Sequence, residues 1–312
     1  MTLLYYSPRF LDHQTGAHPE KPQRLVSVVK HLEDTGLMKR CERPQWEAVT
    51  DERLGRVHCL DYVREVARFA HSGGGRIEAD TMVSAQSYEV ARLAAGAACD
   101  ATAQVLSGKA TNALCLVRPP GHHALQGAAM GFCLFNQVAV AARVALSEFK
   151  LNRVLIVDWD VHHGNGTQDA FWTDGQVGFY SIHRFPFYPG SGAADETGAG
   201  KGLGMTRNVP ITFGTSRADY LAKFTDSLSR FADHVKPELV LISAGFDAHA
   251  QDPIGSLGLE VEDFRQLSRV VQQVATTHAR GRIVSLLEGG YNVDVLPKCV
   301  ATHLEDLLGD AQ

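Results

Sequence analysis

The sequence lacks several features that mark particular classes of protein. No stretch approaches 18 consecutive apolar residues, so we expect no membrane span. The first ten residues, MTLLYYSPRF, lack the basic and then apolar layout of a signal peptide. The six cysteines include no C-x-x-C pair, which favours free thiols in a reducing compartment over disulfides or a structural zinc site. These absences predict a cytoplasmic protein.

Basic residues are not in excess either. Lys and Arg total 30 against 35 Asp and Glu, which gives a formal net charge of −5. This balance argues against a nucleic-acid surface driven by bulk charge and leaves room for an acidic mouth that attracts a cationic substrate. No G-x-S-x-G elbow is present, so a covalent serine nucleophile is not indicated.

What the sequence does contain is a regular alternation of short apolar runs and amphipathic segments. This predicts an α/β fold, a single-domain three-layer α/β/α arrangement over residues 1–312 with a mainly parallel sheet. The expected strands are Leu3–Tyr6, Ala113–Val117, Arg153–Val157, Val177–Ile182, Asn208–Ile211, Leu239–Ser243 and Ile283–Leu287. The expected helices are Arg24–Thr35, Asp51–His58, Tyr62–Ala70, Gln86–Ser107, Phe135–Phe149, Gln168–Trp172, Arg217–Val235, Val261–Arg280 and Val293–Leu308.

Two segments are irregular. Ser72–Gly75 contains three consecutive glycines and is the best candidate for an internal hinge. Phe185–Gly204 is a long glycine-rich loop, and loops of this length inside compact domains are usually functional.

The stretch RVLIVDWDVHHGNGTQ, residues 153–168, places a polar cluster directly after an apolar strand. If the extended backbone continues, Asp158, Asp160 and His162 project from one side, because side chains in a strand repeat every two residues. Carboxylates packed this closely need a compensating cation. Gly164–Gly166 reads as a loop, and Thr167 is expected to cap the helix that follows.

Four strand-to-loop junctions carry unusual polar residues: Val117 into PPGHH, Val157 into DWDVHH, Ser243 into AGFD and Leu287 into EGGY. In a parallel sheet the carboxyl ends of the strands lie along one edge, where such sheets bind their ligands. The four junctions can therefore meet in space. Acids and imidazoles with an open coordination position suit a divalent metal that activates water, with a histidine as general base.

These residues resemble a known family. The blocks RPPGHHA, GFCLFN, DWDVHHGNGTQ, SIHRFPFYPGSG, SAGFDAH and LEGGYN, with HPEKPQRL near the start, resemble the zinc-dependent histone deacetylase superfamily, most closely its class II branch and the bacterial histone deacetylase-like amidohydrolases. The likeness spans nearly the whole chain and implies the arginase/deacetylase-like fold.

The resemblance implies roles for individual residues. Asp160, His162 and Asp247 match the ligands of one catalytic Zn²⁺, although Fe²⁺ remains open as the native metal. The other matches are His123 as general base, His122 as its electrostatic partner or proton donor, Asp158 as the carboxylate that orients His122, Asn165 as the partner of His123, and Tyr291 as the oxyanion donor.

The same resemblance implies an acyl-lysine tunnel and a second ion. Gly131, Phe132 and Tyr188 match tunnel walls, Asp80 loosely matches a rim acid, and Ile254 stands where polyamine-selective relatives carry an acid. Asp158, Asp160, His162, Ser181 and Ile182 match a structural K⁺ site, and Arg24 resembles an arginine that lines an inner cavity.

The implied activity is hydrolysis of the amide of acylated primary amines. The favoured substrate is N-ε-acetyl-lysine in proteins or peptides, because Ile254 offers no charge to a second ammonium. An acetylpolyamine amidohydrolase is the alternative, followed by a non-catalytic acyl-lysine-binding protein and an arginase-like ureohydrolase. The oligomeric state, the acyl-chain preference and the physiological substrate stay open.

Overall fold

The computed structural model describes residues 1–309 and is organised around one seven-stranded sheet. Every strand pairing in this sheet is parallel. From one edge to the other the strands are β1 (Thr2–Tyr5), β4 (Asn112–Cys115), β9 (Ile283–Leu287), β8 (Leu239–Ala244), β5 (Val154–Asp158), β6 (Val177–Arg184) and β7 (Thr206–Ile211). All residues of β5, β8 and β9 are buried, as expected for apolar strands covered on both faces.

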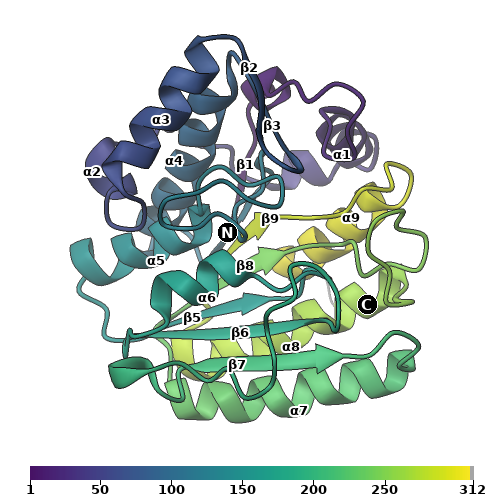
Figure 1. Ribbon diagram of the computed structural model, residues 1–312. Helices are drawn as coiled ribbons and strands as arrows, with labels where there is room; N and C mark the ends of the chain where they lie inside the picture. The colour runs from purple at the N-terminus through teal and green to yellow at the C-terminus, as the bar shows by residue number, and fades with distance from the viewer. Residues whose placement is uncertain (310–312) are drawn as a thin grey trace.

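Helices cover both faces of the sheet, so the expected three-layer α/β/α fold is confirmed (Figure 1). One layer contains α2 (Asp51–Leu54), α3 (Leu60–His71), α4 (Ser87–Leu106), α5 (Gln137–Glu148) and α6 (Asn165–Phe171). The other contains α1 (Gln23–Asp34), α7 (Arg217–Val235), α8 (Val261–Ala279) and α9 (Leu296–Leu308). Short 3₁₀ turns lie at Pro8–Asp12, Leu37–Arg40 and Gly200–Gly202.

The helix ends follow local capping chemistry. At the start of α7, the Ser216 hydroxyl accepts a hydrogen bond from the Asp219 N–H. At the start of α8, Glu260 and Asp263 form a reciprocal capping box. None of the helices within residues 1–309 is long and apolar enough to cross a membrane.

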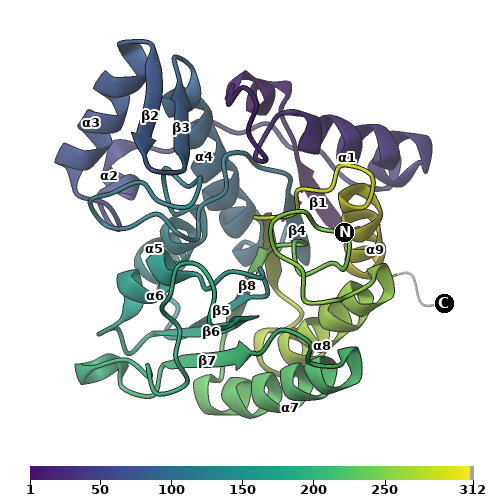
Figure 2. The same cartoon turned by 45° about the vertical axis from the view of Figure 1, so that its right-hand side comes forward.

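The segment Ser72–Gly75, with three consecutive glycines, is not a hinge. Gly74 begins a two-stranded antiparallel hairpin, β2 (Gly74–Glu78) and β3 (Thr81–Ser84), which lies beside α3 and apart from the main sheet (Figure 2). A side chain at Gly74 would collide with the backbone of Val83 on the paired strand, and its φ of +76° favours glycine. The glycines therefore allow close strand pairing, and the turn between the strands presents Asp80.

Two expectations at the central stretch are also wrong. The extended backbone stops at Asp158, the last residue of β5. The next helix begins at Asn165 with Gly164 as its N-cap, so Thr167 lies inside α6. The Thr167 hydroxyl instead accepts a hydrogen bond of 3.0 Å from the Asn136 side chain.

Candidate active site

The four polar junctions meet because β4, β9, β8 and β5 are consecutive strands of the sheet. Their parallel direction places the loops that follow them along one edge. After β5, aspartate side chains accept hydrogen bonds from backbone N–H groups two residues later, and these bonds turn the chain. The N–H of Asp160 donates to Asp158 (3.1 Å), and the N–H of His162 donates to Asp160 (2.9 Å).

Asp160, His162 and Asp247 converge on a common centre. Their candidate ligand atoms all lie within 4.8 Å of one another, and all three residues are buried. His162 Nδ1 lies 3.0 Å from Asp160 Oδ1 and 3.2 Å from Asp247 Oδ2. One imidazole and two carboxylates is a ligand set that Zn²⁺ accepts while leaving a position for water or substrate.

The hydrogen bonds around this trio leave one ligand atom free. The N–H of Gly289 donates to Asp160 Oδ2 (2.8 Å), and the N–H of Val161 donates to Asp247 Oδ1 (2.8 Å). Among residues 1–309, no donor forms a hydrogen bond with the buried Asp247 Oδ2. A buried carboxylate oxygen without a donor is costly unless a cation meets it, so the trio fits a divalent metal.

Two glycines make room for the carboxylates. A Cβ at Gly245 would collide with Asp160, and a Cβ at Gly289 would collide with both Asp160 and Asp247. Any side chain at either position would push a carboxylate out of place.

The tandem histidines lie beside the trio with distinct partners. His122 Nδ1 is 2.9 Å from Asp158 Oδ2, and His123 Nδ1 is 2.6 Å from Asn165 Oδ1. Burial lowers the pKa of His122, but the negative charges of Asp158, Asp160 and Glu288 outweigh it and raise that pKa well above its usual value. Burial and the positive charges of His122 and His162 hold the pKa of His123 well below its usual value.

Glu288 is a further residue of the site, and its role was not predicted from the sequence. Its Oε2 accepts hydrogen bonds from the N–H groups of Gly121 (2.7 Å) and His122 (3.2 Å), so it holds the loop that carries both histidines. Burial raises the pKa of its carboxyl to about 7. The available signal was an acid directly after a buried apolar strand, in LEGGYN.

A cavity of about 240 Å³ opens onto His162 of the buried trio, and every residue predicted for the tunnel lines it. Phe132 packs edge-on to Tyr291 with ring centroids 5.7 Å apart, and Tyr188 packs edge-on to His123 at 5.3 Å. The lining residues are Asp80, His123, Gly131, Phe132, His162, Phe187, Tyr188, Ile254 and Tyr291. Phe187 was not predicted, and its ring stacks on the His162 imidazole at 5.3 Å.

The remaining predicted residues lie just behind the trio. Ser181 on β6 is in register with Asp158 on β5, and both Ser181 and Ile182 are buried. Arg24 is fully buried, donates to the carbonyls of Glu288 (2.5 Å) and Gly290 (2.6 Å), and lies over the Tyr291 ring at 4.9 Å. Arg24 therefore anchors the segment that carries Tyr291.

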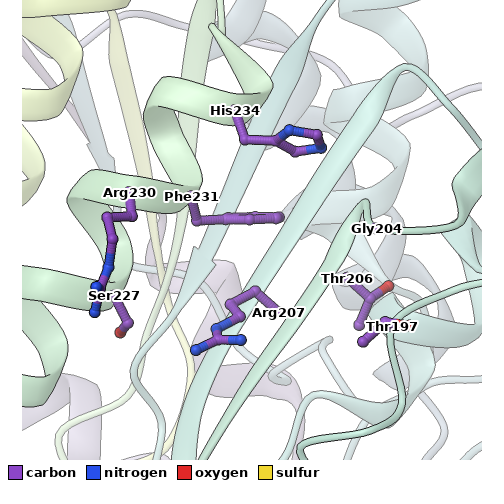
Figure 3. A pocket seen from close by; sticks show the side chains of 8 residues that line it. All are labelled: Thr197, Gly204, Thr206, Arg207, Ser227, Arg230, Phe231 and His234. Atoms are coloured by element: carbon purple, nitrogen blue, oxygen red, sulfur yellow. The ribbon is translucent and has the colours of Figure 1, made fainter.

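A second hollow, of about 420 Å³, lies at the opposite end of the sheet between β7 and α7 (Figure 3). Its lining includes Arg207, Arg230, Phe231 and His234, and no carboxylate from the described part of the chain, residues 1–309, is among its lining residues. Because Arg207 lies at the start of a parallel strand, this hollow faces away from the carboxyl-end edge. It offers no ligand set comparable to the buried trio.

The chain is similar to known deacetylases. A family model described as the histone deacetylase domain matches residues 18–307. Human polyamine deacetylase HDAC10 is 41% identical over 93% of this chain, which spans 45% of that protein. The histone deacetylase-like amidohydrolase of Pseudomonas aeruginosa is 37% identical over 94% of this chain and 77% of its own length. The crystal structure of the HDA15 HD domain matches with a TM-score of 0.94 and 37% identity, covering 99% of this chain and 88% of that one.

Proposed function

Since the chain belongs to the histone deacetylase family and is a hydrolase of that family, we propose that it is a zinc-dependent deacetylase of acylated primary amines, with residues 1–312 as one catalytic domain. The observation that carries the proposal is the buried trio of Asp160, His162 and Asp247. Its imidazole, His162, lines a cavity that Tyr291 also lines. The family is zinc-dependent, and the donor set suits zinc.

Asp160, His162 and Asp247 would hold the zinc ion. When bound, zinc supplies Lewis-acid polarisation of the amide carbonyl and lowers the pKa of water. The two carboxylates would bring one negative charge each to a site that burial keeps away from solvent.

His123 acts as the general base. Its Nδ1–H donates to Asn165 Oδ1, which leaves Nε2 as the acceptor that takes a proton from the attacking water. The depressed pKa of His123 keeps this nitrogen unprotonated at neutral pH.

His122 has the complementary role. Its Nδ1–H donates to Asp158, and the surrounding carboxylates favour its charged form. A cationic His122 protonates the leaving amine, while the Tyr291 phenol donates a hydrogen bond to the developing oxyanion.

The cavity accepts a slim apolar stem. Phe132 and Tyr188 sheathe the methylene chain, and Asp80 at the hairpin turn meets backbone or amine N–H groups at the mouth. Asp158, Asp160, His162, Ser181 and Ile182 would hold a structural K⁺ ion.

We infer that acetyl-lysine of proteins or peptides is the preferred substrate, because the apolar Ile254 lines the cavity where a second ammonium would need an acid. Acetylpolyamines are the second candidate, favoured by the 41% identity to a polyamine deacetylase.

A substrate panel tests both levels of the proposal. Zinc-loaded protein is assayed on an acetyl-lysine peptide, longer acyl-lysine peptides and acetylspermidine, with and without a chelator. Chelator-sensitive hydrolysis of the peptide at a higher kcat/KM than acetylspermidine is expected. Absence of any hydrolysis refutes the deacetylase, whereas a preference for acetylspermidine refutes only the substrate assignment.

A further inference from the structure

Arg184 connects three segments that frame the cavity. It is the last residue of β6, and its N–H donates to the Val161 carbonyl (2.9 Å), between the metal-trio residues Asp160 and His162. Its guanidinium donates to the Gly255 carbonyl (3.1 Å), next to Ile254. One residue thus contacts both the loop after β5 and the loop that carries Ile254.

Two phenyl rings pack on the same guanidinium. Its Cζ lies 4.2 Å from the ring centroid of Phe187 and 4.4 Å from that of Phe213. Within residues 1–309, no carboxylate forms an ion pair with Arg184, so the rings and the Gly255 carbonyl are its partners. Cation–π packing of this kind stabilises the ring position as well as the charge.

The stack continues to the proposed metal site. Phe187 lines the cavity and lies nearly parallel to the His162 imidazole, with an interplanar angle of 17°. At the other end, Phe213 follows β7 and is 62% exposed. The column Phe213, Arg184, Phe187, His162 therefore runs from the surface to the floor of the cavity.

We propose that Arg184 is a positioning residue that sets the width of the cavity by holding Phe187 and the Ile254 loop in place, an inference that rests on the proposed function. Removing the guanidinium releases one wall, so a thicker substrate stem is accepted more readily. The exposed Phe213 supports Arg184 from outside and acts in the same direction with a smaller effect.

Arg184→Met tests this on zinc-loaded protein. Arg143→Met is the matched control, because Arg143 also packs on a phenyl ring (Phe171, 4.6 Å) but lies outside the cavity. Phe213→Ala is compared with Leu203→Ala, which removes another exposed apolar side chain, 67% exposed.

Two hydroxamates serve as probes, one with a straight alkyl linker and one with a phenyl ring in the linker, and their Kd values are measured by calorimetry. The Arg184→Met substitution is expected to shift the ratio of the two Kd values about tenfold toward the phenyl probe, equivalent to about 1.4 kcal/mol. Phe213→Ala is expected to shift it about twofold to threefold, and both controls by less.

The ratio is independent of the fraction of folded protein, and Phe213→Ala provides the test if Arg184→Met fails to fold. If Arg184→Met folds, an unchanged ratio of the two Kd values in that variant overturns the proposal. If it does not fold, an unchanged ratio in Phe213→Ala does so. The same ratio is then measured for kcat/KM on acetyl amides with a lysine stem and with an aminomethyl-phenylalanine stem. Binding without turnover in the wild type would refute the deacetylase and leave the binding ratios to decide the role of Arg184.

Discussion

Replacing Tyr291 by Phe is the most informative single change at this site. Within the described chain the Tyr291 hydroxyl makes no hydrogen bond, while its ring is held by Phe132 and Arg24. The Tyr291 N–H, which donates to Asp252 (2.7 Å), is unaffected by the change. The substitution therefore removes no interaction that holds the fold and leaves no partner unsatisfied, so the free energy of unfolding should change little.

The substitution should slow the reaction instead. Loss of one preorganised oxyanion donor lowers kcat by about 10²–10³-fold, or about 2.7–4 kcal/mol of transition-state stabilisation. KM should change little, because the donor acts on charge that develops only in the transition state.

The assay compares kcat, KM, zinc content and Tm for the wild type and the variant on an acetyl-lysine peptide. Tyr220→Phe is the control, since the buried Tyr220 hydroxyl also has no hydrogen-bond partner within residues 1–309 but does not line the cavity. A Tyr291→Phe enzyme with more than about one tenth of wild-type kcat would refute the oxyanion role. A loss of zinc or of Tm would show that the hydroxyl serves the fold.

Three further predictions concern the metal, the substrate and acid stability. Asp160→Asn should reduce zinc content below about one tenth of the wild-type value by elemental analysis, and undiminished zinc would contradict the ligand assignment. Ile254→Glu should raise kcat/KM for acetylspermidine relative to an acetyl-lysine peptide by up to about fivefold, the effect of an ion pair of about 1 kcal/mol. An unchanged ratio would show that this position does not contact the second ammonium. Burial lowers the pKa of His58 to about 4 in the folded protein. Because the unfolded chain binds this proton more readily, with a pKa of about 6.5, the contribution of neutral His58 to folding stability is complete above pH 6.5 and is lost as the pH falls toward 4. Urea unfolding should therefore show that the free energy of unfolding falls between pH 7 and pH 5 by about 2 kcal/mol less in His58→Gln than in the wild type. An equal fall in the two proteins would refute the argument.

Much of the fold could be predicted because its periodicity is local. The bounds of α7 and β9 match the expected ranges, since amphipathic spacing defines the helix and a bounded apolar run defines the strand. The β2–β3 hairpin was missed because β2 is partly exposed along its whole length and has no alternation of apolar and polar residues. Three adjacent glycines resemble a flexible link unless the paired strand is known.

The site was predictable to the extent that its residues follow strands. The trio and both histidines come directly after apolar runs, so their meeting followed from the parallel sheet alone. Glu288 also follows a strand directly, but its role depends on its hydrogen bonds to the loop that carries the tandem histidines, far away in sequence. Phe187 was not predictable, because its position depends on how its loop packs on His162. Nothing local distinguishes Phe187 from its aromatic neighbours.

The interleaved strand order has a consequence for synthesis on the ribosome. The loops that build the cavity end with the one after β9, and β9 lies between β4 and β8 in the sheet. A nascent chain that extends just beyond Asp247, in the loop after β8, has all three residues of the proposed metal trio. It lacks Gly289, Tyr291 and the strand that joins the two halves of the sheet. The proposed site is therefore complete only after β9 and the loop that follows it have left the exit tunnel.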